Sequence, residues 1–306
     1  MGTLHFFLLA GGLGTRTRPL SLYKPKPVFP LAGIPLLQII LDQLKEKGLD
    51  TGFINLHYLP EAIRDCVDKM MDKPDIHFLN EEILSGNKIL KEAIPFLYQG
   101  DLLLTINADM FLEIPVQNML AQLNESKTEG IILTRRNIEQ NPSYKSILTE
   151  GKGFIGRKIH PPDKSVSPDS LMYTGVALLK PGILQHIDEI NIFDSIEKNK
   201  IPISIFNYDG PWLDIGDPKS YMNSDSQYKL YIRNKHNIDS TLTNTNSLSR
   251  NVKISSCSVV ENSIIWDNTE VKKNSIIRNC IITGNIILEK AHYENCIITP
   301  IGIESL

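Results

Sequence analysis

The first two hundred residues alternate short apolar runs with segments whose apolar residues recur every three or four positions. Leu4 to Ala10 and Leu102 to Ile106 are nearly continuous apolar runs, as expected for buried strands. Pro35 to Gly48 opens with proline, carries apolar residues at helical spacing and ends at glycine, which predicts a helix. This alternation predicts an α/β fold with a Rossmann-like, mostly parallel sheet covered by helices.

Further segments of the same kind lie between the two apolar runs. Each predicted strand is short, and each predicted helix places its apolar residues on one face. The strands are expected at Ile54 to Leu56 and Ile76 to Leu79, and the helical faces at Ile63, Cys66, Val67 and Met70, and at Ile89, Leu90, Ala93, Ile94 and Leu97.

After a helical stretch from Tyr221 to Ile232, the apolar period changes to about six. Such a period fits neither a plain strand nor a helix, and it is typical of the hexapeptide repeats of a left-handed parallel β-helix. An antiparallel sheet rich in isoleucine and valine is the alternative. The residues that carry the repeat are Val259, Ile265, Val271 and Ile277 and, after a one-residue slip, Ile282 and Leu288.

Two domains follow from this change of period. We expect an α/β domain over residues 1–235 and a short β-helix over 240–306, with about three or four coils of roughly eighteen residues each. A β-helix this short leaves a terminal coil uncovered, so we also expect a homo-oligomer formed through the repeats.

Composition and charge narrow the classes of partner. The 306 residues are 42% hydrophobic with a formal net charge of −3, which disfavours nucleic acid and membrane surfaces as partners. The first apolar run is too short to cross a bilayer and follows no basic segment, so we expect a cytoplasmic protein. The cysteines are too widely spaced for a zinc site and are predicted to be reduced, packed thiols: Cys66, Cys257, Cys280 and Cys296.

A glycine-rich loop follows the first predicted strand. It contains Gly11, Gly12 and Gly14, whose backbone can approach a ligand closely. Thr17 stands where a dinucleotide-binding GxGxxG motif needs glycine, and no lysine completes a phosphate-loop motif. Both common glycine-rich motifs are therefore excluded.

The charges around this loop point to a polyphosphate. No acidic residue precedes Asp42, whereas four cations do, namely Arg16, Arg18, Lys24 and Lys26. In a sheltered cleft each cation–phosphate contact is worth about 4 kcal/mol before desolvation, against about 1 kcal/mol in bulk water. A solvated basic loop is the alternative, but three prolines stiffen the segment.

Residues 8 to 37, LLAGGLGTRTRPLSLYKPKPVFPLAGIPLL, resemble the signature of the sugar-phosphate nucleotidylyltransferases, LAGGxGTRLxPLT followed by PKP. The resemblance implies that Arg16 holds the outer phosphates and the departing pyrophosphate, and that Lys26 neutralises the phosphates at the reacting centre. It also implies that the backbone of the first loop contacts the nucleotide, through Leu9, Ala10, Gly11, Gly12, Gly14 and Thr15.

Two aspartates match the family's metal-binding motifs. Asp109 follows a predicted central strand in Asn107-Ala108-Asp109, similar to NGD, and Asp214 lies in WLDIGDP, which resembles WxDIGxP. The resemblance implies a Mg²⁺ site on Asp109 and Asp214, and Mg²⁺ is the usual cofactor of nucleotidyl transfer. Asp217, just before Pro218, is expected to be a helix N-cap instead.

The sugar side matches the family less closely. Tyr173-Thr174-Gly175-Val176 resembles the NAGIY strand, which implies a sugar contact at Gly175. The EKP element has no clear counterpart, so Lys158, or Lys164, is expected to hold the sugar phosphate. The stretch from Glu81 to Lys88 replaces the usual LGTAG-like loop, and Gly86 there is the expected nucleotide contact.

The resemblance implies an enzyme that joins a nucleoside triphosphate to a sugar 1-phosphate, giving a nucleotide-sugar and pyrophosphate. GTP and mannose 1-phosphate are the first choice of substrates. One alternative is a catalytically weak regulatory paralogue that binds nucleotide-sugar, because the loop after Glu81 departs from the family. A second is a hexapeptide-repeat acyltransferase, although only His292 in the repeats offers a base.

Overall fold

The computed structural model describes residues 2–236, 246–290 and 292–306. The chain forms two compact units, each assembled from separate stretches of sequence. The first unit comprises Met1–Gly11, Leu41–His57 and Asp72–Trp212, and the second comprises Gly12–Ile40, Tyr58–Met71 and Leu213–Leu306. The domain boundary expected near residues 235–240 stays a prediction, and its far side, 240–245, lies outside the described residues.

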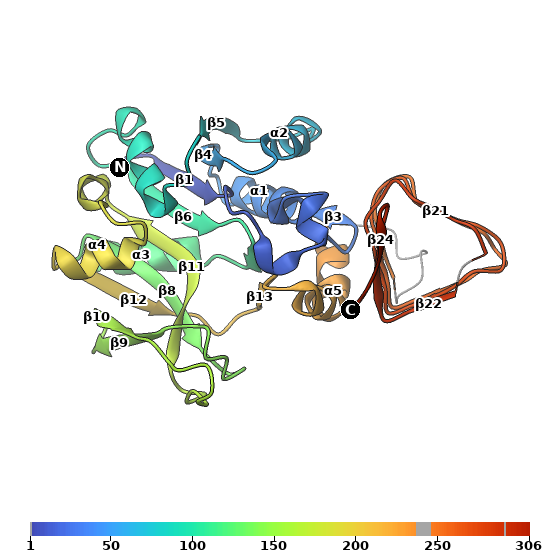
Figure 1. Cartoon of the computed structure of the whole chain (residues 1–306). Coiled ribbons are helices and arrows are strands. Elements are labelled where there is room, and N and C mark those ends of the chain that lie inside the picture. The colour runs from blue at the N-terminus through green and yellow to red at the C-terminus, as the bar shows by residue number, and fades with distance from the viewer. Residues whose placement is uncertain (1, 237–245, 291) are drawn as a thin grey trace. The chain divides into compact units, whose positions relative to one another are not determined.

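The first unit is built on one nine-stranded sheet, in the order β5-β4-β1-β6-β11-β8-β12-β10-β9 (Figure 1). Strands β5, β4, β1 and β6 are parallel, whereas β11 runs antiparallel to both of its main neighbours, β6 and β8. The α/β fold and its parallel half are thus confirmed. The strands are β1 (Leu4–Leu9), β4 (Thr51–Leu56), β5 (Asp75–Asn80), β6 (Leu102–Asn107), β8 (Gly130–Arg136), β9 (Ser146–Glu150), β10 (Gly153–Lys158), β11 (Leu171–Leu179) and β12 (Ile203–Asn207).

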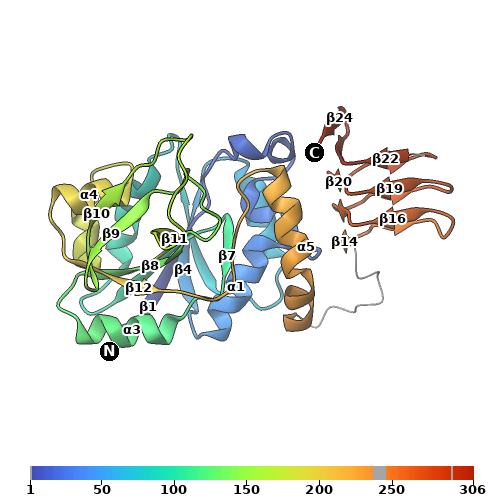
Figure 2. The same cartoon turned by 90° about the horizontal axis from the view of Figure 1, so that it is seen from below.

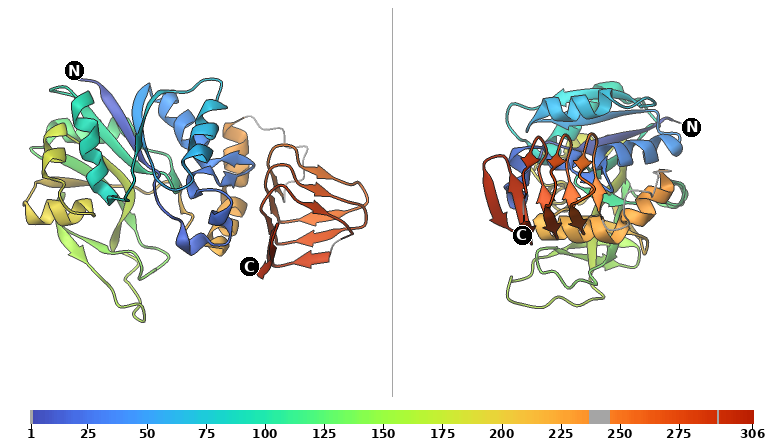
Figure 3. Two further views of the ribbon diagram at one scale, coloured as in Figure 1. Left: turned by 45° about the horizontal axis from the view of Figure 1, so that its top comes forward. Right: turned by 90° about the vertical axis from the view of Figure 1, so that its right-hand side faces the viewer.

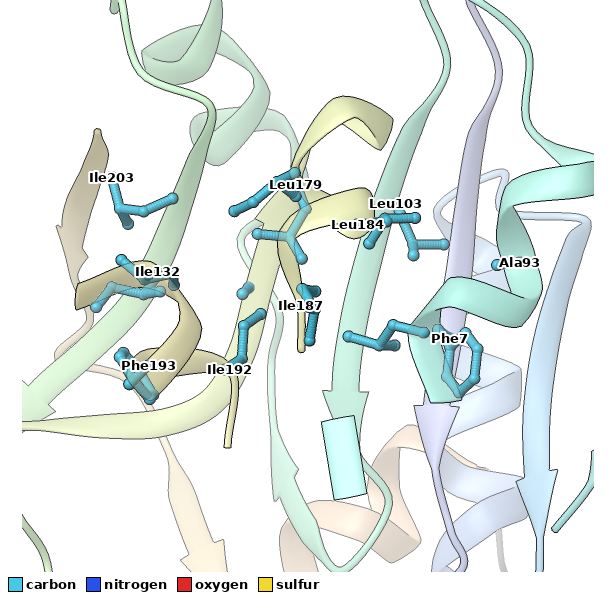
Figure 4. Close-up of a cluster of buried hydrophobic side chains, with 14 of the residues drawn as sticks. Phe7, Ala93, Leu103, Ile132, Leu179, Leu184, Ile187, Ile192, Phe193 and Ile203 are labelled. Carbon is cyan, nitrogen blue, oxygen red and sulfur yellow. The ribbon is translucent and has the colours of Figure 1, made fainter. Parts of the chain in front are cut away.

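A cluster of buried apolar side chains covers one face of this sheet (Figure 4). Phe7, Leu103 and Ile132 of the strands meet Ala93 and Phe193 of the helical segments above them. Burial of this apolar area is the main force that holds helices and sheet together. The helical segments of this unit are η4 (Gly86–Phe96), α3 (Val116–Glu125), η5 (Pro181–His186) and α4 (Ile192–Lys198), together with most of α1 (Leu36–Glu46).

The segment predicted as a helix around Ile89 to Leu97 is a 3-10 helix, η4. Ile89, Leu90 and Ala93 are buried, so the predicted apolar face is correct. The α-helix itself is wrong, because Pro95 lies inside the segment and cannot donate the backbone hydrogen bond that a regular helix requires there.

The second unit begins with short helical turns in the basic loop and continues into α5 and the repeats. Asp217 caps α5 by accepting a hydrogen bond from the backbone N–H of Ser220, as predicted, and the Ser220 hydroxyl accepts the Asp217 N–H in return. The elements before the repeats are η1 (Thr15–Thr17), η2 (Leu20–Leu22), η3 (Lys26–Val28), β2 (Pro30–Leu31), β3 (Ile34–Pro35), α2 (Pro60–Asp68) and α5 (Pro218–Lys235).

An aromatic cluster fastens α5 and the basic loop to the repeats within this unit. The Phe29 ring lies 5.3 Å from Tyr221 of α5 and 5.0 Å from Trp266 of the repeats, measured between ring centroids. Trp266 Nε1 donates to the Tyr221 hydroxyl, which donates in turn to the carbonyl of Pro30. These buried rings satisfy their polar groups internally, so the contact combines apolar area with hydrogen bonds.

The repeats wind into a coil with three sides, visible in outline in Figure 1. Strands of successive coils pair in parallel and form three small sheets; Figure 2 shows β16, β19 and β22 stacked in one of them, and Figure 3 shows the coils from two more sides. This agrees with the predicted left-handed parallel β-helix. The strands are β14 (Ser247–Leu248), β15 (Lys253–Ile254), β16 (Val259–Glu261), β17 (Ile264–Ile265), β18 (Glu270–Val271), β19 (Ile276–Arg278), β20 (Ile281–Ile282), β21 (Ile287–Leu288), β22 (His292–Glu294), β23 (Cys296–Thr299) and β24 (Gly302–Ser305).

One coil contains seventeen residues rather than the expected eighteen. Ile265 pairs with Ile282, seventeen positions later, and Val260 pairs with Ile277 at the same interval. The inward residue of β16 is therefore Val260, and the assignment of Val259 to the repeat is wrong: Val259 is 40% exposed, whereas Ile277 is fully buried. In the coil from Val260 to Ile277 two sides advance by six residues and one by five, whereas the next coil, from Ile277 to Tyr293, spans sixteen residues because two of its sides advance by five.

Asparagines occupy the corners of the coils. Asn262, Asn279 and Asn295 all have positive φ, a conformation that asparagine tolerates better than most residues. The Asn262 side chain donates to Asn279 at 2.7 Å, and Asn279 donates to Asn295 at 3.1 Å. A second ladder of the same kind joins Asn251, Asn268 and Asn285. The ladders fix the stacking of one coil on the next.

Three of the four cysteines are buried, as predicted, and all four are free thiols. Cys280 and Cys296 lie in the interior of the β-helix, where burial raises the pKa of Cys296 to about 12. The packed position predicted for Cys257 is wrong, because this residue is exposed on a turn between β15 and β16. Among the described residues, no helix has both the length and the apolar character needed to cross a lipid bilayer.

Candidate active site

The turn at the carboxyl end of β1 brings Leu9, Ala10 and Gly11 to the edge of the parallel sheet. The Ala10 N–H donates to Oδ1 of Asn55 at 2.7 Å, which ties this turn to the end of β4. A Cβ at Gly11 would lie 2.7 Å from Nδ2 of the same Asn55 side chain. Only glycine fits here, and its backbone lies at the strand ends, where open α/β sheets bind ligands.

Asn55 belongs to a polar network that the sequence analysis did not single out. Its Nδ2 donates to one carboxylate oxygen of Glu81, and the other oxygen accepts the N–H and hydroxyl of Ser85 at 3.0 and 2.6 Å. An asparagine in the middle of the apolar strand Ile54-Asn55-Leu56 is the signal that marks it, because a buried amide needs partners. The network shapes the loop that departs from the family pattern.

Gly86 begins η4 directly after that network. Its φ is +63°, and a Cβ there would lie 2.4 Å from the carbonyl oxygen of Ile190. Packing within the first unit therefore requires glycine at this position. Its predicted contact with the nucleotide stays a prediction.

Asp109 lies in the turn between β6 and β7 (Met110–Leu112), where it is half-buried. Gly175 of β11 packs against the same turn: a Cβ there would lie 2.1 Å from Sδ of Met110 and 3.2 Å from Cβ of Asn107. The φ of Gly175 is +94°, and the pairing of β11 with β8 is irregular at this point. Gly175, predicted to contact the sugar, thus packs against Asn107 and Met110, which flank the turn that carries Asp109.

A small cavity of about 170 Å³ lies further along the first unit, lined by Lys145, Arg157, Tyr173 and others. The Arg157 guanidinium is 8% exposed and pairs with Asp194 at 2.5 Å and Glu197 at 2.8 Å, which raises its pKa against the effect of burial. Lys158, the predicted sugar-phosphate residue, is exposed and does not line this cavity. Lys145 lines this cavity, although no motif in the sequence pointed to it.

In the second unit, the carbonyl of Gly14 organises the basic loop. It accepts hydrogen bonds from the Thr17 hydroxyl at 2.7 Å, the Ser21 hydroxyl at 2.8 Å and the Thr17 N–H at 3.0 Å. Thr17 is fully buried, so its hydroxyl has a structural use in the position where the family usually carries leucine. Gly12 contrasts with this tight turn, since no described atom lies within 4 Å of where its Cβ would be.

The two predicted catalytic cations occupy different environments. Thr15 and Arg16 of η1 are exposed. Lys26 is only 6% exposed, and its Cγ lies 3.4 Å from where a Cβ of Gly14 would be. An exposed guanidinium and a buried lysine beside the glycine turn are suited to different parts of one polyphosphate.

Asp214 ends β13 (Trp212–Asp214) and is half-buried, with Gly216 two positions after it. Asp109 belongs to the first unit and Asp214 to the second, so their joint action on one metal stays a prediction. In the part of the chain that is described, no three His, Cys, Asp or Glu side chains form a metal cluster. The donor set nevertheless fits Mg²⁺, which is usually held by one or two carboxylates and by the substrate's phosphates.

Comparison with known proteins agrees with the fold and with these motifs. Residues 6–229 match the nucleotidyl transferase family, and residues 230–293 match the GlmU-like C-terminal hexapeptide family. A putative mannose-1-phosphate guanyltransferase of Sulfolobus acidocaldarius is 30% identical over 90% of this chain and 74% of its own length. The mannose-1-phosphate guanyltransferase of Schizosaccharomyces pombe is 26% identical over 75% of this chain, which covers 65% of that protein.

Solved structures share the fold at lower identity. UDP-glucose pyrophosphorylase from Acinetobacter baumanii superposes with a TM-score of 0.64 and 16% identity over 75% of this chain and 94% of that one. A putative glucose-1-phosphate thymidylyltransferase from Bacillus anthracis gives a TM-score of 0.63 and 16% identity over 74% and 96%. The family match spans far more than half of the residues, and the chain therefore belongs to the nucleotidyl transferase family of enzymes, with a C-terminal hexapeptide-repeat region.

Proposed function

We propose that this enzyme transfers a nucleoside monophosphate from a nucleoside triphosphate to a sugar 1-phosphate, giving a nucleotide-sugar and pyrophosphate. The observation that carries the proposal is the basic loop, in which the Gly14 carbonyl gathers three hydrogen bonds and Lys26 is buried beside it. Such a loop offers two kinds of group to a polyphosphate: the cation of Lys26, and the backbone N–H at Gly12, where no side chain crowds the approach. A solvated basic loop would leave Lys26 in water.

In this reaction an oxygen of the sugar phosphate attacks the α-phosphorus, a new P–O bond forms, and the bond to pyrophosphate breaks. Arg16 is assigned to the outer phosphates, because an exposed guanidinium can bind them in bidentate fashion. Lys26 is assigned to the charge that develops near the reacting phosphorus. Asp109 and Asp214 are assigned to Mg²⁺, which when bound neutralises phosphate charge.

The sugar is assigned to the region of Gly175, since its bare backbone lies beside the Asp109 turn. Lys158 or Lys164 remains the proposed partner of the sugar phosphate, and Lys145 is an additional candidate because it lines a cavity with Tyr173. Arg157 is less suited, since two carboxylates already neutralise its charge.

GTP and mannose 1-phosphate are the substrates we propose first, because several relatives carry the name mannose-1-phosphate guanyltransferase. A regulatory paralogue is less favoured, since the loop after Glu81 keeps a defined structure: the Glu81 carboxylate accepts hydrogen bonds from Asn55 and Ser85. An acyltransferase is disfavoured as well, because the side chain of His292 is 67% exposed and pairs with Glu294.

The test is a matrix of GTP, UTP, dTTP and ATP against mannose, glucose and galactose 1-phosphates, with pyrophosphate release followed for each pair. We expect turnover with at least one pair, greatest for GTP and mannose 1-phosphate. Release with a different pair would correct the substrates, whereas no release with any pair would reject the enzyme activity in favour of the regulatory paralogue.

The oligomer expected through the β-helix belongs to this proposal too. The last strand, β24, pairs antiparallel with β23 and has an exposed outer edge with Ile301 and Ile303 in water. An open edge of this kind is suited to a second copy of the chain. Light scattering at micromolar concentration should give a dimer or larger assembly, and a monomer would contradict the expectation.

A further inference from the structure

The β-helix supplies the carboxylate that the basic loop lacks. No acidic residue precedes Asp42 in the sequence, and the Lys24 ammonium pairs instead with Asp267, at 2.5 Å, in the turn between β17 and β18. The same ammonium lies 5.3 Å from the centroid of the Trp266 ring, within the range of a cation–π contact. Oδ1 of Asp267 accepts the Arg250 N–H at 3.1 Å, which fixes the carboxylate on the β-helix. One cation of the loop is therefore neutralised and held by the repeats.

The same segment of chain is held again on the far side of Lys26. The Phe29 ring lies 5.0 Å from the Trp266 ring, measured between centroids. Further along, a Cβ at Gly33 would lie 2.3 Å from the carbonyl oxygen of Leu248 in β14, so backbone packs directly on backbone. All of these residues belong to the second unit. Lys26 therefore lies between points at which the chain is fixed to the first two coils.

The chain between these points is short and stiff. Pro25 and Pro27 flank Lys26 and fix the backbone φ on both sides of it. A hydrogen bond from the Phe29 N–H to the Lys26 carbonyl, at 3.0 Å, closes the turn η3. A shift of Lys24 away from the β-helix would thus be carried to Lys26, because few freely rotating bonds of the backbone separate the two.

We infer that the β-helix takes part in the reaction by positioning Lys26, with Asp267 as a positioning residue that acts through Lys24. The inference rests on the proposed function, in which Lys26 stabilises charge near the reacting phosphorus. A small displacement of such a group lowers the rate, because its stabilisation of the transition state depends on accurate placement. The repeats thus have a role in addition to the assembly proposed above.

The order of the loop can be measured without any substrate. Asp267→Asn removes the charge that holds Lys24 and keeps an oxygen for the Arg250 N–H. Glu270→Gln is the matched control, because Glu270 pairs with another lysine of the same β-helix and its side chain is 38% exposed, against 35% for Asp267. The measurement is hydrogen–deuterium exchange of the peptide that spans residues 24–29. We expect faster exchange in Asp267→Asn and wild-type exchange in Glu270→Gln.

Steady-state kinetics of pyrophosphate release then tests the link to the reaction. We expect Asp267→Asn to lower kcat about tenfold with a smaller change in the KM for the triphosphate, and Glu270→Gln to leave both unchanged. Lys24→Ala should lower kcat to a similar extent. The double variant should lose no more than about either single variant, because both changes break the same contact.

The alternative is that Lys24 binds a phosphate directly. Lys24→Ala would then raise the KM for the triphosphate, whereas Asp267→Asn would release the ammonium and lower that KM. This pattern, or faster exchange with an unchanged kcat, would overturn the inference. Unchanged exchange in Asp267→Asn, with release by the wild-type protein, would reject only the role of the β-helix. Absence of release from the wild-type protein would instead reject the proposed function, and with it any role in the reaction.

Discussion

The nine-stranded sheet and the β-helix use their polar residues in opposite ways. In the first unit, Asn55, Glu81 and Asp109 lie at or just after the carboxyl ends of parallel strands, where we propose that the ligand binds. In the β-helix, Asn262 and Asn279 sit at corners and bond to the next coil. The polar residues at the strand ends are thus the ones proposed for chemistry, whereas the asparagines at the corners of the β-helix hold neighbouring coils together.

The largest effect should come from the predicted metal ligands. Asp109→Ala and Asp214→Ala should each lower the rate of pyrophosphate release by roughly a thousandfold or more, because phosphoryl chemistry depends on charge neutralisation. The rate is measured under saturating Mg²⁺. Asp217→Ala is the matched control: it removes only the cap of α5, at about 1 kcal/mol, and should retain turnover. Near wild-type turnover in both site variants would reject the assignment.

The core of the β-helix should tolerate little change. Ile277→Ala removes a fully buried side chain and should lower the free energy of unfolding by about 2–5 kcal/mol. Val259→Ala, on the exposed neighbouring position of the repeat, should change it by less than about 0.5 kcal/mol. Urea unfolding followed by circular dichroism measures both. Equal losses would mean that the coil is not in the register Val260 to Ile277.

Arg16 and Lys26 should differ from each other in kinetics. Arg16→Ala should raise the KM for the triphosphate and lower kcat, each by about tenfold, because it binds outer phosphates in both ground and transition states. Lys26→Ala should lower kcat by about ten- to a hundredfold with a smaller change in KM. Steady-state kinetics distinguishes the two. If both variants lose only a few-fold in the same parameter, the basic loop lies outside the reaction centre.

The smallest effect should come from the corner ladder. Asn279→Ala removes two side-chain hydrogen bonds and places alanine at a φ of +50°, so we expect a loss of about 1–2 kcal/mol in unfolding free energy. Asn279→Gly should recover part of this loss, since glycine accepts the positive φ. Thermal unfolding of the two variants separates the contribution of φ from that of the ladder.

The sequence predicted the fold well where neighbours in the chain determine structure. Apolar runs such as Leu102 to Ile106 predict strands because burial on both faces demands continuous apolar residues. The period of six predicted the β-helix because each side of a coil turns one apolar residue toward the interior. The inward position of Val260 was missed, because two adjacent valines carry no information on which side of the strand faces inward until the partner coil is known.

The site was predicted less completely, because it depends on contacts between distant segments. The motif residues around Gly11 and Asp109 could be proposed from the sequence alone, and their roles stay predictions. The network of Asn55 and Glu81, twenty-six positions apart, depends on the parallel pairing of β4 and β5, which no local pattern specifies. Nor could the sequence show that Gly86 is required by packing against Ile190.

The seventeen-residue coil also sets the unit of length change in this part of the chain. Asn251, Asn268 and Asn285 are each seventeen positions apart, so inserting or removing one whole coil keeps every corner and every inward side chain in its place. A one-residue difference is accommodated as well, because Asn279 and Asn295, sixteen positions apart, still form a step of the other ladder. We therefore expect homologous repeats to differ in length by complete coils of sixteen or seventeen residues.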